Sequence, residues 1–93
     1  MILPVKYSEL DIARRRLIRQ EYIRLQDNTC WFCFAKLDKD PPKEIADKPI
    51  DHSLFPETFF KYPIHLHHDH KTDMTIGAVH SHCNAVLWQY YGE

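Results

Sequence analysis

The sequence has few cysteines and no long apolar stretch. Its three cysteines are an odd number and too few for a disulfide framework, and no signal-peptide pattern follows the first residue. We therefore expect a reducing, cytoplasmic setting, in which thiols bind metals more often than they form disulfides. No apolar run approaches the roughly 20 residues that a bilayer span needs, so we expect a soluble protein with no membrane partner.

Length and charge limit the fold more than the function. A chain of 93 residues is expected to form a single domain, 1–93, and a domain this short gains from a structural metal. The net charge of −1 says nothing about partners, and the sequence has neither internal repeats nor low-complexity tracts. The basic residues are unevenly placed, however, because five arginines fall between positions 14 and 24.

The arginine-rich segment is predicted to form a basic N-terminal helix over residues 8–27. Ser8 and Asp11 make an S-x-x-D pattern that is typical of a helix start. Apolar residues recur at helical spacing on the side expected to pack: Leu10, Ala13, Leu17, Ile18 and Leu25. The opposite side carries Arg15, Arg16 and Arg19, which form either an ordinary solvated face or a surface that binds DNA phosphates regardless of sequence.

Cysteine and histidine spacings predict a structural zinc site. Cys30 and Cys33 form a C-x-x-C pair, and His80 and Cys83 repeat the same gap, which lets two ligands reach one tetrahedral ion from a tight turn or a helix start. A redox role for the first pair would need a βαβ context, and the sequence predicts none around it. The alternative is that the three thiols are buried apolar groups. A zinc ion held by all four residues would join distant parts of the chain.

The rest of the chain divides into an irregular insertion and a compact C-terminal unit. Residues 36–62 contain the prolines of a surface loop and an aromatic cluster, which is more typical of core or loop packing than of nucleic-acid binding. Residues 64–70 alternate as a strand, 76–79 form a short return strand and 80–91 a helix. The predicted fold class is α+β, with a ββα core over 63–91, an N-terminal helix and a structural zinc site.

Six of the seven histidines lie between positions 65 and 82. Imidazole is a frequent metal ligand with a pKa near neutrality, so this density fits a site at which metal binding and proton transfer meet. On the predicted strand, His67 and His68 would face opposite sides because side chains alternate. An Asp51-His52 pair in the insertion is a weaker candidate for such a site.

Two runs of the sequence resemble a known family when they are taken together. The run HLHHDH at 65–70 is followed by GAVHSHCN at 77–84, and a helix and a C-x-x-C pair precede both. This order resembles the HNH, or ββα-metal, nucleases, and in particular the phage recombination endonuclease VII group. The resemblance covers about 17–87, with an insertion over 36–63. It implies a hydrolase that nicks or cleaves the phosphodiester bonds of DNA, and it suggests a phage or prophage origin and a location in the host cytoplasm.

The resemblance also implies roles for the polar residues of these runs. His68 would be the general base, and His67 and Asn84 would hold one catalytic divalent ion, either Mg²⁺, Mn²⁺ or another transition metal. Asp69 or His70 would orient a ring or contact phosphate. In an alternative register, Asp69 is the metal ligand and His70 the base.

Two residues depart from the family pattern. His67 stands where the family has a metal-binding aspartate, and this favours Mn²⁺ or a transition metal over Mg²⁺. His80 stands where the family has a zinc-binding cysteine, a change that zinc tolerates. His65 and His82 are expected to be supporting or surface residues.

The predicted function is that of a metal-dependent DNA endonuclease with a histidine base and one catalytic ion. A non-catalytic, zinc-stabilised nucleic-acid-binding or adaptor module is the alternative, and a redox or metal-storage protein built on the thiols is a third possibility. DNA is the expected partner. The sequence leaves the oligomeric state open, with a monomer favoured. No segment corresponds to the part that the endonuclease VII group uses for dimerisation and junction binding, so resolution of DNA junctions is not expected.

Overall fold

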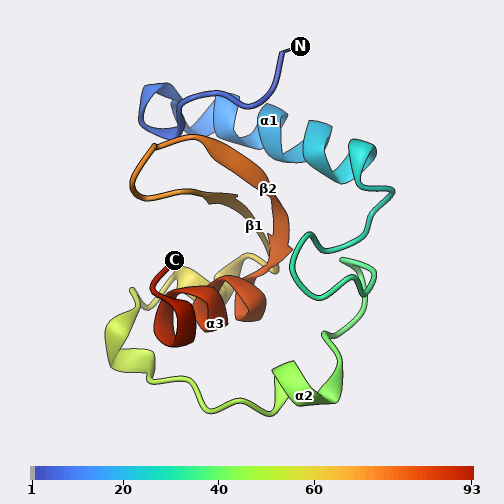
Figure 1. The fold of residues 1–93 in the computed structure, drawn as a ribbon, viewed down its shortest axis with the longest axis vertical. Helices are drawn as coiled ribbons and strands as arrows, with labels where there is room; N and C mark the ends of the chain where they lie inside the picture. Colours follow the sequence, from blue (N-terminus) through green and yellow to red (C-terminus); the bar gives the residue numbers. More distant parts are fainter. Residues whose placement is uncertain (1) are drawn as a thin grey trace.

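The computed structural model describes residues 2–93 and places two helices, α1 (Ile12–Leu25) and α3 (Ser81–Tyr91), on opposite sides of a two-stranded hairpin (Figure 1). The strands β1 (Ile64–His68) and β2 (Thr75–His80) pair antiparallel, and both helices contact both strands. The predicted α+β class is thus confirmed. Within the described residues, no helix is long and apolar enough to cross a bilayer.

The N-terminal helix begins later than predicted and at a different cap. Asp11 is the N-cap, and its carboxylate accepts a hydrogen bond from the Arg14 N–H at 2.8 Å. Ser8 lies in a short 3₁₀ turn, η1 (Tyr7–Glu9), and bonds to the carboxylate of Asp73. The predicted start at Ser8 is wrong because the serine makes a long-range contact that local spacing does not reveal.

The packed side of α1 matches the prediction only in part, since Ile18 was expected to pack and Tyr22 was not. Ile18 and Tyr22 are buried, whereas Leu17 and Leu25 are 55% and 57% exposed. The hydroxyl of Tyr22 shares a 2.9 Å hydrogen bond with the hydroxyl of Thr75 on β2. A count of aliphatic residues finds Ile18 but misses Tyr22, because tyrosine has an apolar body that packs and a polar tip that needs a partner.

The hairpin carries a bulge at the histidine run. His67 pairs with Gly77, but His68 pairs with Thr75, so that Ile76 is the extra residue on β2. Bulges bend a strand and change the direction of its side chains. The extra residue lies on β2, so the pairing register shifts between His67 and His68 while β1 itself carries no inserted residue.

The end of the predicted strand 64–70 is a turn instead. The carboxylate of Asp69 accepts hydrogen bonds from the N–H groups of Lys71 and Thr72, at 2.7 and 3.1 Å. Aspartate commonly stabilises a turn in this way. The strand ends here because the Asp69 side chain bonds to the backbone of the residues that follow it.

The segment 36–62 passes beside α3 and is mostly irregular (Figure 1). Its regular elements are short: α2 (Lys43–Ala46), η2 (His52–Leu54) and η3 (Phe59–Lys61). Helix α3 holds it through side chains. The hydroxyl of Tyr90 donates to the Pro49 carbonyl at 2.6 Å, and Nε2 of His82 lies 2.7 Å from the Ile45 carbonyl.

Gln26, at the end of α1, attaches that helix to β2. Its side-chain oxygen accepts from the Ala78 N–H and its side-chain nitrogen donates to the Ala78 carbonyl, both at 2.9 Å. The N–H of Trp31 donates to the same carbonyl at 3.0 Å. A Cβ on Gly77 would lie 2.7 Å from the Gln26 oxygen, so glycine is needed for this close approach.

Candidate functional site

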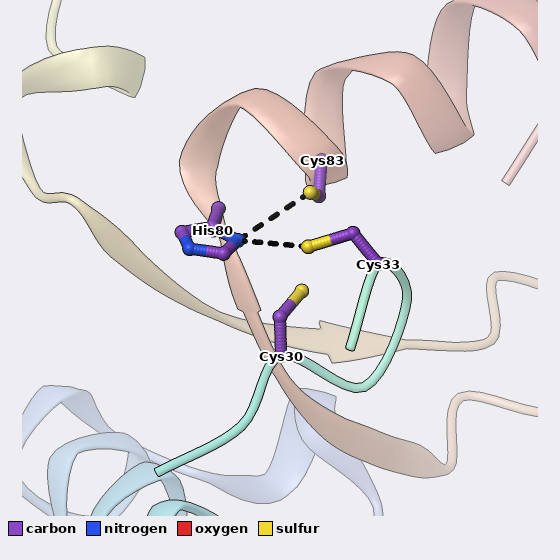
Figure 2. Close-up of side chains that lie close together, drawn as sticks. All are labelled: Cys30, Cys33, His80 and Cys83. Carbon is purple, nitrogen blue, oxygen red and sulfur yellow. Dashed lines mark hydrogen bonds between the residues drawn. The ribbon is translucent and has the colours of Figure 1, made fainter. Parts of the chain in front are cut away.

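Cys30, Cys33, His80 and Cys83 come together in the structure, as their spacing predicted (Figure 2). The first two lie in the loop after α1, His80 ends β2, and Cys83 lies in the first turn of α3. One ligand atom of each residue lies within 4.8 Å of the other three, and the four side chains turn toward a common centre. We call these residues the Cys₃His cluster.

The distances within the Cys₃His cluster suit a tetrahedral ion. Nδ1 of His80 lies 3.4 Å from Sγ of Cys33 and 3.5 Å from Sγ of Cys83. A tetrahedron with metal–sulfur bonds of about 2.3 Å and a metal–nitrogen bond of about 2.0 Å has sulfur–nitrogen edges of roughly 3.5 Å. The cluster could therefore hold a zinc-type ion with little rearrangement.

The backbone fixes the second ring nitrogen of His80. Nε2 lies 3.0 Å from the carbonyl of Lys36 and 2.7 Å from that of Lys39. Carbonyl oxygens only accept, so Nε2 must carry the hydrogen and Nδ1 presents its lone pair to the sulfurs. The loop after Cys33 thus sets the ring tautomer that metal binding requires.

The three thiols of the cluster perturb one another strongly. The pKa of Cys30 is lowered to about 4, mainly by a hydrogen bond from Cys83 and also by hydrogen bonds from nearby backbone N–H groups. The same contact, with burial, raises the pKa of Cys83, and burial raises the pKa of Cys33. One thiolate is therefore favoured over three, and a bound cation would supply the charge that lets the others ionise.

A second group of polar side chains lines a pocket of about 510 Å³, which we call the histidine pocket. Helix α1 contributes Arg15 and Arg19 to it, and the insertion contributes apolar and aromatic residues. The hairpin strand β1 and helix α3 supply polar residues: His65, His67, His68 and Asn84. Asn84 directly follows Cys83, so consecutive residues of α3 belong to the two sites.

His67 has a buried ring nitrogen without a hydrogen-bond partner among the described residues. The residue is 2% exposed, and its Nε2 has no partner among the described residues. Burial lowers the pKa of His67, so the neutral ring is favoured. Leaving such a buried polar atom unpaired costs about 1–3 kcal/mol. A metal ion bound to Nε2 would remove that cost.

Asn84 lies beside His67 and is bonded to His65. Its Nδ2 is 3.1 Å from Nδ1 of His65, whose Nε2 is 2.7 Å from the Phe59 carbonyl. The carbonyl requires the hydrogen on Nε2, so Nδ1 accepts from the Asn84 amide. The amide oxygen of Asn84 is then the atom left for a ligand. An imidazole nitrogen from His67 and this oxygen are a donor set that could help to bind a divalent ion.

His68 is held in a stack of rings. The ring of Tyr7 lies parallel to it, with centroids 3.8 Å apart and 3° between the planes, and the guanidinium of Arg15 lies 4.1 Å from the Tyr7 ring centre. The ring of His70 meets His68 edge-on at 4.7 Å. Burial lowers the pKa of His68, and the neighbouring charge of His70 adds to this effect. His68 is therefore favoured as a neutral ring that can accept a proton.

The structure separates Asp69 from the other candidates of the run. Its carboxylate stabilises the turn, and it is not among the residues described as lining the histidine pocket. His70 does line the pocket and is exposed, with its ring 5.3 Å from that of Trp88. The alternative register would make Asp69 a metal ligand, but the described lining of the pocket does not include Asp69. Asp51 and His52 are exposed, and the described pocket lining includes neither.

Two of the three predicted DNA-binding arginines reach the histidine pocket. Arg15 and Arg19 are half-buried and border the stripe formed by Ile18 and Tyr22, so they do not lie opposite the packed face as predicted. Nε of Arg15 is buried and has no hydrogen-bond partner in the part of the chain that is described. Arg16 is exposed and lies outside the described lining.

Two contacts of the pocket have no signal in the sequence. Tyr7 reaches His68 because its segment is tied to the hairpin, through a bridge between Lys6 and Met74. The carbonyl of Phe59 holds His65, and a backbone atom leaves no trace in residue type. No family model, curated protein or solved structure matches the chain. The function is therefore inferred from the residues of the two sites.

Proposed function

We propose that the protein is a metal-dependent DNA endonuclease of the ββα-metal (HNH) type that hydrolyses phosphodiester bonds in the histidine pocket. One observation carries the proposal: a buried His67 nitrogen with no partner among the described residues lies in the same pocket as the stacked, neutral His68. Arg15 and Arg19 line that pocket too. Phosphodiester hydrolysis needs such a combination of metal ligand, base and cations.

The Cys₃His cluster would hold a structural zinc ion. Four protein ligands leave no position for water or substrate, which is typical of structural rather than catalytic zinc. The ion would join the loop of Cys30 to the junction of β2 and α3, where Asn84 lies. Its role in catalysis would be to keep the pocket assembled.

His67 and Asn84 would hold the catalytic ion through Nε2 and the amide oxygen. When bound, that ion supplies stabilisation of charge on the phosphate oxygens and on the departing 3′ oxygen. The imidazole of His67 is a softer donor than a carboxylate, so we expect Mn²⁺ or a transition metal to bind better than Mg²⁺.

His68 would take the proton of the attacking water. The Tyr7 ring, 3.8 Å away, limits the rotation of the His68 imidazole. The lowered pKa of His68 keeps that ring neutral and able to accept a proton. Arg15 and Arg19 would bind the phosphates next to the scissile bond, and a phosphate oxygen would satisfy the buried Nε of Arg15. His70, exposed at the pocket, would contact phosphate.

Conversion of supercoiled plasmid to nicked or linear DNA tests this proposal. Zinc-loaded protein is assayed with Mg²⁺, Mn²⁺, Ni²⁺ or no added metal, alongside His68→Ala and His70→Ala. We expect cutting that requires added metal and falls about 100- to 10,000-fold in His68→Ala, the range typical of a general base. His70→Ala should retain most activity, and loss only in that variant would move the base to His70.

A non-catalytic, zinc-stabilised nucleic-acid-binding or adaptor module is the second candidate. The observation in its favour is that Glu93 is the single acidic residue among those described as lining the pocket, although the hard ions used in hydrolysis prefer carboxylate oxygens. If the folded, zinc-loaded protein binds DNA but cuts none with any ion, the protein is this binding module and not an endonuclease.

A further inference from the structure

The histidine pocket has an aromatic side that the proposed hydrolysis does not use. The insertion supplies it, through five of the residues that line the pocket: Leu54, Phe55, Pro56, Phe59 and Tyr62. The same pocket is lined by Arg15 and Arg19 of α1. Rings and guanidinium groups thus border one space.

The rings of this side are fixed relative to the proposed metal ligands. The Phe55 and Phe59 centroids lie 4.6 Å apart, and Phe59 meets the ring of His65 edge-on, also at 4.6 Å. Nε2 of His65 is bonded to the carbonyl of Phe59, and its Nδ1 to Asn84. A molecule resting on the aromatic side would therefore lie at a defined position from Asn84.

Tyr62 offers the largest free surface on this side. It is 62% exposed, and the one ring contact described for it is a weak one, with the ammonium of Lys61 at 5.8 Å from the ring centre. Exposed single aromatic residues are common on protein surfaces. This one differs because it lines a pocket that also contains two arginines and four histidines.

We propose that the histidine pocket binds an unpaired stretch of DNA, with a base stacked on Tyr62 and the adjoining phosphates at Arg15 and Arg19. This inference rests on the proposed nuclease function and names its substrate class. In a duplex, neighbouring base pairs cover both faces of each base, so only an unpaired base can stack on a side chain. Cationic groups combined with aromatic rings are typical of single-strand binding, whereas binding to duplex phosphates needs the cations alone.

Binding can be measured separately from cutting in the His68→Ala protein, zinc-loaded and without added divalent metal. The probes are a fluorescein-labelled oligothymidylate and a blunt-ended hairpin duplex with the same number of phosphates, compared at one salt concentration by fluorescence anisotropy. We expect the oligothymidylate to bind at least about 10-fold more tightly than the duplex, because each stacked base contributes about 1–3 kcal/mol. Equal affinities, or tighter binding of the duplex, would overturn the proposal.

Tyr62→Ala tests the stacking contact, and Phe34→Ala is its matched control. Phe34 is 79% exposed and lies beside Cys33, outside the described lining of the histidine pocket. Tyr62→Ala should weaken oligothymidylate binding about 5- to 150-fold and leave duplex binding unchanged, since one base stack is lost. Phe34→Ala should change neither. A Tyr62→Ala variant that loses affinity for both probes equally, or for neither, would refute the stacking role.

The two proposals fail in different experiments. If plasmid and single strands are both left uncut while the oligothymidylate preference persists, hydrolysis is wrong and the single-strand site stands. If DNA is cut but the two probes bind alike in the His68→Ala protein, the nuclease stands and the substrate class proposed here is wrong.

Discussion

Cys83 and Asn84 are consecutive residues of α3, yet they belong to two sites that are built differently. In the Cys₃His cluster, four ligand atoms lie within 4.8 Å of one another, and the backbone holds the second nitrogen of His80. In the histidine pocket, Nε2 of His67 has no partner in the described chain, and Asn84 has only its oxygen free. A closed set of four ligands is typical of a structural metal site, and an incomplete set leaves room for water and substrate.

The difference predicts that substitutions will divide into two classes. Changes in the Cys₃His cluster should act on stability, and changes in the histidine pocket should act on activity while the fold persists. Trp31 connects the two sites, because it follows Cys30 and its ring centre lies 5.6 Å from that of His67. Loss of the first metal should therefore disturb the second site, but the reverse effect should be small.

The largest effect is expected from Cys83→Ala or from removal of the bound metal. A structural zinc site contributes on the order of 10 kcal/mol, which is comparable to the entire stability of about 5–15 kcal/mol of a small domain. We expect loss of the cooperative thermal transition in circular dichroism, and loss of the bound zinc, which we expect at one ion per chain in the intact protein. His68→Ala should keep both. A metal-free Cys83→Ala protein that melts like the unmodified one would show that the cluster is only a group of buried thiols.

The next largest effect is expected at His67. His67→Ala removes the unpartnered nitrogen, so plasmid cutting should fall about 100- to 1000-fold while the zinc content stays the same. His67→Asp is the informative comparison, because a carboxylate favours hard ions. The ratio of the His67→Asp activity in Mg²⁺ to its activity in Mn²⁺ should be higher than the same ratio for the unmodified protein. An unchanged ratio would mean that position 67 does not contact the catalytic ion.

A smaller effect is expected at Tyr7, whose ring stacks on His68 at 3.8 Å. Tyr7→Ala frees the imidazole to rotate, and we expect kcat to fall about 10- to 100-fold with little change in KM, the cost of a misplaced catalytic group. Tyr7→Phe keeps the ring and should restore nearly full activity. If Tyr7→Phe is as impaired as Tyr7→Ala, the hydroxyl matters and the stacking does not.

The parts of the molecule that sequence reasoning predicted depend on spacing along the chain. The C-x-x-C and H-x-x-C gaps place Cys30, Cys33, His80 and Cys83 correctly, because each gap is a local property and a tetrahedral ion needs two such pairs. The order strand, strand, helix in residues 63–91 is likewise visible from local periodicity and is present in the structure.

The parts that were missed depend on contacts between distant residues. The bulge at Ile76 shifts the pairing register opposite the histidine run, and no residue type in the run signals it. The capping pattern at Ser8 is misleading because Asp73, far along the chain, bonds to that serine. The buried side of α1 depends on Tyr22, whose hydroxyl needs Thr75 as a partner before the ring can be buried.

The smallest expected effect is a change in the pH dependence of stability at His65. Burial lowers the pKa of His65 below 6.5 in the folded protein, so above that pH neither state binds the proton and stability is unaffected. As the pH falls below about 6.5, the unfolded chain takes up a proton that the folded chain does not, so stability falls until the folded pKa is reached, by at most about 1.4 kcal/mol per pH unit. His65→Gln can still donate a hydrogen bond to the Phe59 carbonyl but does not titrate. In urea unfolding between pH 7.5 and 5, its stability should fall less steeply than that of the unmodified protein, and parallel curves would show that His65 titrates alike in both states.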